Sequence, residues 1–97
     1  MYESKMKSED TDRLFQAMLS LQNEEECYRF FDDLCTIGEI QAMTQRLEVA
    51  RLLRAGKTFT QISEETGVSS ATITRVNKCI SYGSGGYELA LERSKRR

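Results

Sequence analysis

The residues best suited to chemistry lie in one stretch of twenty, Phe59 to Lys78, which reads FTQISEETGVSSATITRVNK. Small side chains and hydroxyls are gathered there with two cations, Arg75 and Lys78. Hydroxyl and methyl groups suit the edges of DNA bases in the major groove. A guanidinium can bind guanine or phosphate, and an ammonium acts mainly as a point charge on phosphate. This combination favours nucleic-acid binding over catalysis.

The candidate DNA-binding residues lie at the starts of two predicted helices and along the second of them. Small side chains at Ser70 and Ala71 would let the second helix enter the groove closely. There a hydroxyl can bond either base type and a methyl can meet thymine. Hydroxyls and free backbone N–H groups at the start of the first helix would bind phosphate. The full set is Thr58, Thr60, Ser69, Ser70, Ala71, Thr72, Thr74, Arg75 and Lys78.

The same stretch has the spacing of a helix-turn-helix over about residues 59–81. Ser63 is small enough for two helices to cross closely, and Gly67 can adopt the positive φ of a tight turn. Apolar residues at helical spacing would face inward and leave the candidate DNA-binding residues outside. These inward residues are Ile62, Val68, Ile73 and Val76. The alternative is an unrelated helix pair whose exposed Thr, Arg and Lys only aid solubility.

The chain is expected to form one all-α domain over residues 1–97, with five or six helices. Pro is absent, aromatic residues make up 8%, and apolar residues recur at helical spacing, as in the stripe Leu14, Phe15, Met18 and Leu21. Capping residues and glycines mark the later boundaries. The predicted starts are Asn23, the Thr36–Glu39 capping box, the Thr58–Gln61 capping box, Ser69 and about Tyr87. The predicted stops are about Cys35, Gly56 and the run Tyr82 to Gly86.

The third predicted helix is apolar on two sides. One side carries Ile40, Met43, Leu47 and Ala50, and another carries Ala42, Val49 and Leu53. A single neighbour cannot cover both sides, so this helix is expected to be central and to pack against a second subunit.

Charge is divided unevenly along the chain, whose formal net charge is −1. Residues 1–40 hold four Lys/Arg and ten Asp/Glu, or −6, whereas residues 41–97 hold ten and five, or +5. The basic part contains the candidate motif and would orient a polyanion toward one surface. Solvated basic faces are common, so this asymmetry alone decides little.

Three cysteines and no histidine argue against a metal site, and the absence of a CxxC pair excludes a zinc finger. Cys27 and Cys35 are about 12 Å apart along one predicted helix, beyond disulfide reach. Unpaired thiols, no signal peptide and no long apolar run favour the cytoplasm and no membrane. The thiols are expected to be buried as small hydrophobes, with redox sensing as the alternative. Without His, no catalytic arrangement is recognisable, and no enzyme activity is expected.

The last part of the chain joins a glycine run to a basic tail. The sequence YGSGG lacks the pattern of a phosphate-binding loop and is interpreted as a linker, with a nucleotide loop as the alternative. In the tail, Arg93, Lys95, Arg96 and Arg97 are interpreted as a solvated end, with DNA contact as the alternative.

Between Leu34 and Ile80 the sequence LCTIGEIQAMTQRLEVARLLRAGKTFTQISEETGVSSATITRVNKCI resembles the Trp repressor superfamily, with ATITR as its most specific part. Over its length the chain is similar to the YerC/YecD group of Trp repressor-related proteins. The resemblance implies an intertwined, all-helical homodimer that binds double-stranded DNA as a transcriptional repressor. A symmetric dimer would read a roughly palindromic operator.

The resemblance also implies a ligand pocket. The family's tryptophan is flanked by two arginines, which suggests Arg46 and Arg75 here, and a family Ser corresponds to Cys79. The family's Gly beside the ring is Val76 in this chain, whose methyl groups would occupy that space. Tryptophan is therefore not expected to be the corepressor, and the expectation is no cofactor or an unidentified small-molecule effector. The alternative function is a protein-interaction module that docks on a partner of the transcription machinery.

Overall fold

The computed structural model describes residues 2–94, and the regular secondary structure in this part of the chain consists of helices, without a strand. Its helices are α1 (Glu9–Leu19), α2 (Glu24–Leu34), α3 (Ile37–Arg54), α4 (Phe59–Thr66), α5 (Ser70–Tyr82) and α6 (Gly86–Ser94). The predicted all-α class is confirmed. The chain divides into two compact units, the first ending at Ile37 and the second beginning at Gly38. The expected single domain over residues 1–97 stays a prediction.

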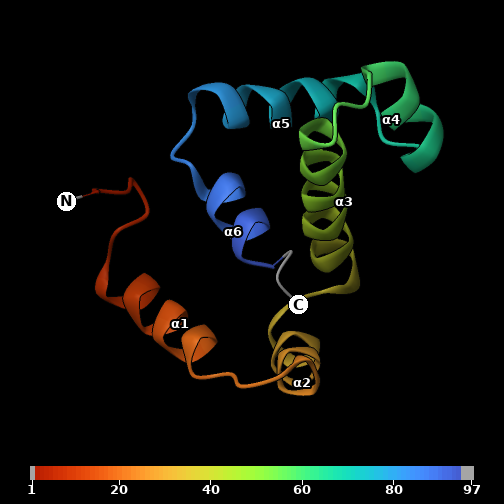
Figure 1. Ribbon diagram of the computed structural model, residues 1–97. Helices are drawn as coiled ribbons and strands as arrows, with labels where there is room; N and C mark the ends of the chain where they lie inside the picture. The colour runs from red at the N-terminus through yellow and green to blue at the C-terminus, as the bar shows by residue number, and fades with distance from the viewer. Residues whose placement is uncertain (1, 95–97) are drawn as a thin grey trace. The chain divides into compact units, whose positions relative to one another are not determined.

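The first unit contains the helices α1 and α2 (Figure 1). Ser8 caps α1 by accepting a hydrogen bond from the Thr11 N–H at 3.1 Å, a cap that was not predicted from the sequence. The predicted cap Asn23 accepts from the Glu26 N–H at 2.9 Å, so the start of α2 is confirmed. No residue of α1 or α2 is fully buried. These amphipathic helices therefore lack an enclosed core of their own.

The end of α3 is fixed by Gly56, as predicted. Gly56 has φ 85°, and its N–H donates to the Leu53 carbonyl at 3.1 Å. The Lys57 N–H donates to the Leu52 carbonyl at 3.1 Å. These two bonds form a Schellman motif, in which a residue with positive φ ends the helix and pairs its last carbonyls.

The core of the second unit joins one end of α3 to α4, α5 and α6 (Figure 1). The four residues predicted to face inward from the motif are all buried, which confirms their assignment. Leu91 of α6 completes the cluster. The buried residues are Val49, Ala50, Leu52, Ile62, Val68, Ile73, Val76 and Leu91. Leu52 was predicted on neither apolar side of the third helix.

The first half of α3 is less covered than its end. Met43 and Leu47 keep 41% and 45% of their surface exposed, and Ile37 is also exposed. The two-sided apolar pattern is therefore satisfied only near Val49 and Ala50 within this chain. Packing of the remainder against a second subunit stays a prediction.

Two ion pairs fasten α6 to α3. Arg54 lies 3.5 Å from a Glu88 oxygen and 3.3 Å from a Glu92 oxygen. The predicted interruption is confirmed, because α5 ends at Tyr82 and α6 begins at Gly86. The interpretation of Lys95, Arg96 and Arg97 as a solvated tail concerns residues outside the described part of the chain. Between residues 2 and 94, no helix is long and apolar enough to span a membrane.

Candidate nucleic-acid interface

The start of α4 is a closed capping box, as predicted. The Thr58 N–H donates to the Gln61 side-chain oxygen at 2.9 Å, and the Gln61 N–H donates to Thr58 Oγ1 at 3.1 Å. Because a hydroxyl has one proton and two lone pairs, Thr58 keeps its proton for another acceptor while it caps the helix. Thr60 lies exposed in the first turn. Both predicted phosphate-binding residues therefore remain accessible.

The connection between α4 and α5 is a three-residue turn, Gly67 to Ser69. Gly67 has φ 72°, which confirms the predicted need for glycine. Thr66, which was not predicted to matter, fixes the turn from inside. Its hydroxyl donates to the Ile62 carbonyl at 2.7 Å and accepts from the Val68 N–H at 3.1 Å. A Thr just before a helix-ending Gly was the signal that could have identified it.

The first turn of α5 uses two of the candidate hydroxyls internally. Ser69 Oγ accepts from the Thr72 N–H at 3.3 Å, which confirms the predicted cap. The Ser69 hydroxyl donates to Thr72 Oγ1 at 3.2 Å. The Ser69 hydroxyl therefore both donates and accepts a hydrogen bond within α5, so its main role is to cap the helix. The side chains of Ser70, Ala71 and Thr74 remain exposed.

The outward side of α5 forms one line of exposed residues. Ile73 and Val76 are buried, and a helix turns by about 100° per residue. The opposite side therefore carries Ala71, Lys78 and Tyr82, with Thr74 and Arg75 on its flanks. We call these five residues the α5 outer face; all five are exposed.

Tyr82 was not among the predicted site residues, because it stands at the start of the glycine run. It is the last residue of α5, and 90% of its surface is exposed. Its position four residues after Lys78 was the signal that could have placed it on the same helical face. The α5 outer face therefore ends at Tyr82, whose Cα lies about 16 Å along the helix axis from that of Ala71, at 1.5 Å per residue.

The two cations on this face have no carboxylate partner among the described residues. Within residues 2–94, neither Arg75 nor Lys78 forms an ion pair. Three other cations of the second unit form ion pairs with carboxylates: Arg51 with Glu48, Arg54 with Glu88 and Glu92, and Lys57 with Glu65. Arg46 and Arg93 form none within residues 2–94. Unpaired cations project their charge into solvent, where a polyanion can bind them.

The shortest of these ion pairs joins the side chains of two residues one turn apart on α3. Arg51 donates to both Glu48 carboxylate oxygens, at 2.9 and 2.6 Å. These hydrogen bonds lower the pKa of Glu48 and raise the pKa of Arg51. The pair keeps this guanidinium engaged within α3.

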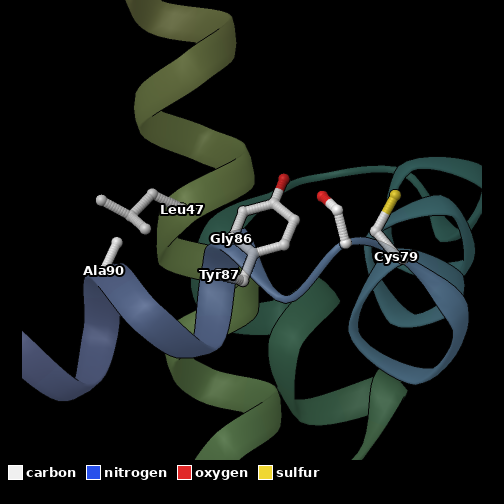
Figure 2. A pocket seen from close by; sticks show the side chains of 7 residues that line it. Leu47, Cys79, Gly86, Tyr87 and Ala90 are labelled. Atoms are coloured by element: carbon white, nitrogen blue, oxygen red, sulfur yellow. The ribbon is translucent and has the colours of Figure 1, made fainter. Parts of the chain in front are cut away.

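Of the three predicted ligand residues, Cys79 alone lines the pocket among α3, α5 and α6. This pocket is mainly apolar and has a volume of about 460 Å³. Figure 2 shows the Tyr87 ring projecting between Leu47 and Cys79, with Ala90 nearby. Arg46 and Arg75 are not among the residues that line this pocket, so no arginine clamp is formed there.

The three cysteine side chains are not buried as expected. Cys27 and Cys79 are exposed and Cys35 is half-buried, so the prediction of buried thiols is wrong. Cys27 lies beside the acidic first turn of α2, and Cys79 lies at the edge of the pocket. Among the described residues no group of three or more His, Cys, Asp and Glu side chains could hold a metal ion.

Comparison with known proteins places these features in a family. The sequence model of the family described as Trp repressor protein matches residues 9–95, and the chain belongs to this family of DNA-binding regulators. It is 58% identical over 91 residues to the uncharacterized protein YerC of Bacillus subtilis (strain 168), covering 94% of this chain and 88% of YerC.

Two solved structures have the same fold. A TrpR-like protein from Eubacterium eligens is 48% identical, with a TM-score of 0.89 and 94% of each chain covered. A candidate Trp repressor from Staphylococcus aureus is 46% identical, also with a TM-score of 0.89, covering 94% of this chain and 91% of that one. Their fold confirms the resemblance found in the sequence.

Proposed function

We propose that the chain is a transcriptional repressor that acts as a homodimer and reads a palindromic operator through α4 and α5. The observation that carries this proposal is the α5 outer face. It combines small side chains at the start of a capped helix with two unpaired cations farther along it. A helix of this kind can enter the major groove by its N-terminal end while its cations bind phosphate or guanine.

The start of α4 would supply a second phosphate contact. The capping box at Thr58 engages the N–H of Gln61 and leaves the N–H groups of Phe59 and Thr60 directed outward at the positive end of the helix dipole. With the Thr58 and Thr60 hydroxyls, these groups suit one phosphate. Phosphate binding at α4 would fix the register in which α5 meets the bases.

Formation of a homodimer would bury apolar side chains that are exposed in the single chain. The first half of α3 and the helices α1 and α2 leave apolar side chains uncovered, and burial of such surface stabilises an obligate dimer. Two α5 helices related by a two-fold axis would meet successive major grooves about 34 Å apart. In this assembly residues 1–97 would act as one domain of each subunit.

The proposal also covers the location of the protein, its lack of catalysis, its approach to DNA and a small-molecule effector. The protein would act in the cytoplasm, without enzymatic activity and without a cofactor. The division of charge, −6 in residues 1–40 and +5 in residues 41–97, would orient the basic unit toward DNA during approach. A small-molecule effector, other than tryptophan, could act through the pocket beside Cys79.

The test is selection of DNA from a random duplex library by the purified protein, with the oligomeric mass measured on the same sample. A two-fold symmetric sequence enriched by a dimer would support the proposal. Enrichment should weaken steeply with salt, because phosphate binding releases counterions. Failure to enrich any sequence, followed by capture of a transcription protein from nuclease-treated lysate, would instead support the protein-interaction module.

A further inference from the structure

The first turn and a half of α5 contains no side chain that can read a base by two hydrogen bonds. Bidentate recognition of a purine needs Arg, Lys, Asn or Gln. The sequence from Ser69 to Thr74 contains only Ser, Ala, Thr and Ile, and the Ile is buried. The bases nearest the helix start must therefore be distinguished by smaller groups.

Hydrogen bonding within α5 occupies some of the hydroxyl groups that could otherwise contact bases. The Ser69 hydroxyl is engaged in both directions by Thr72, whose own side chain is half-buried. Ser70 and Thr74 keep exposed hydroxyls, but a hydroxyl can donate or accept and so bonds either base type. These groups contribute affinity with little discrimination.

Ala71 is placed differently from the hydroxyls. It lies on the outward line of α5, opposite buried Ile73 and Val76, and its side chain is a single exposed methyl. In the major groove one base feature is apolar, namely the 5-methyl group of thymine. We infer that each half-site of the operator is recognised by packing of a thymine 5-methyl group on the Ala71 methyl, with the Thr74 methyl beside it.

This inference rests on the proposed function and specifies its ligand more closely. The recognised group is a 5-methylpyrimidine rather than a pattern of donors and acceptors. Thymine and 5-methylcytosine present the same methyl, whereas uracil pairs like thymine and lacks it. Burial of one methyl contributes about fourfold in affinity, so two half-sites would contribute about sixteenfold.

The test uses the operator enriched by the selection experiment. Each thymine is replaced in turn by deoxyuridine, in both half-sites at once, and the Kd is measured at fixed salt. We expect one position at which affinity falls by about sixteenfold, with deoxyuridine elsewhere causing little change. 5-Methylcytosine at that position, paired with guanine, should bind more tightly than cytosine there.

Protein variants connect the effect to Ala71. Ala71→Gly removes the Ala71 methyl and should reduce the preference for thymine over deoxyuridine to the part that the Thr74 methyl contributes. Ala71→Ser keeps the helix better formed but adds a hydroxyl to the contacting Cβ, so it should also reduce the preference, by a smaller factor. Ser70→Ala is the matched control and should remain as sensitive to deoxyuridine as the unmodified protein. Thermal melting of each variant verifies that it is folded.

The outcomes separate this inference from the function on which it rests. An enriched operator with no thymine that is sensitive to deoxyuridine would overturn the inference and leave the DNA-binding function intact. Equal sensitivity in Ala71→Gly, Ala71→Ser and the unmodified protein would overturn the assignment to Ala71. Failure to enrich any DNA would overturn both.

Discussion

The backbone N–H of Gly67 donates to the carbonyl of Ser63 at 2.8 Å while Gly67 adopts φ 72°. This bond pairs a carbonyl of the last turn of α4, and the positive φ of Gly67 turns the chain toward α5. Ser63 and Gly67, the small residue and the glycine predicted from the sequence, are therefore joined by a backbone hydrogen bond. The direction in which α5 leaves the turn depends on this left-handed residue.

Replacement of Gly67 by alanine should destabilise the fold by about 1–2 kcal/mol, because a side chain raises the energy of the left-handed conformation. A Cβ at Gly67 would meet no atom within 4 Å, so the cost is conformational rather than steric. Urea denaturation measures the effect. Gly86→Ala is the control, since Gly86 begins α6 without positive φ and also has open space around it. Equal stability of the two variants would contradict the role of the turn.

Simultaneous Arg75→Ala and Lys78→Ala substitutions should abolish DNA binding and leave the protein folded. The two cations are exposed and unpaired among the described residues, so the variant cannot bind the same phosphates, yet it breaks no ion pair. The slope of log K against log salt should become shallower by about one for each phosphate that is no longer bound. Fluorescence anisotropy with the selected operator measures both quantities.

A control of equal charge removes two cations from the first unit, as Arg13→Ala and Arg29→Ala. It breaks the exposed ion pairs of these residues with Asp10 and Glu25, which contribute little to stability. Both arginines are exposed and lie on α1 and α2. If this control weakened DNA binding as strongly as the α5 variant, net charge rather than the α5 outer face would explain binding.

Tyr82→Phe should weaken DNA binding by about two- to tenfold for all sequences, the value of one hydrogen bond. Tyr82 lies at the end of the α5 outer face, where the helix would leave the groove and cross the phosphate backbone in the proposed complex. A loss confined to particular operator sequences would indicate a base contact instead. Tyr28→Phe on α2 is the control, because Tyr28 is also exposed but lies in the other unit. Unchanged affinity of the Tyr82 variant would exclude this contact.

Glu48→Gln should destabilise the protein by about 0.3–0.5 kcal/mol near neutral pH, the usual value of an exposed helical ion pair. Hydrogen bonds from Arg51 lower the pKa of Glu48. The stabilisation is therefore present above the pKa of the unfolded carboxyl and is lost as the pH falls through the lower folded value.

Denaturation curves from neutral to acid pH test this dependence. The difference between Glu48→Gln and the unmodified protein should disappear at acid pH. Glu64→Gln is the control, because Glu64 forms no ion pair within residues 2–94. A difference that persists at the acid end would assign the effect to packing.

Free tryptophan should show no saturable binding in the micromolar range by calorimetry. The pocket beside Cys79 is lined by Leu47 and Tyr87 but by neither Arg46 nor Arg75, the two residues that the family resemblance would place around the ring. The selected operator, titrated into the same sample, verifies that the protein is active. A saturable micromolar isotherm with tryptophan would contradict the prediction.

Local features of the fold were predictable because they depend on nearby residues. The caps at Asn23, Thr58 and Ser69 and the positive φ at Gly56 and Gly67 involve hydrogen bonds over a few positions. Buried Ile73 and Val76 follow from helical period alone. The candidate reading residues on α5 were therefore identified as those left outside.

Features that depend on distant contacts were harder to predict. The ion pairs of Arg54 with Glu88 and Glu92 join residues more than thirty positions apart. The burial of a cysteine also depends on what packs over it, so Cys27 and Cys79 were wrongly assigned to the interior. Tyr82 was overlooked because the following glycines placed the predicted end of the helix just before it.

The short connection between α3 and α4 has a mechanical consequence. Successive backbone N–H groups at Gly56, Lys57 and Thr58 are all engaged, by Leu53, Leu52 and Gln61 respectively. These hydrogen bonds restrict the connection between α3 and α4, so it is not a flexible hinge. We therefore expect a small tilt of α3 to move the start of α4 with it, so that a change in the packing of α3 would shift the position of the helix-turn-helix.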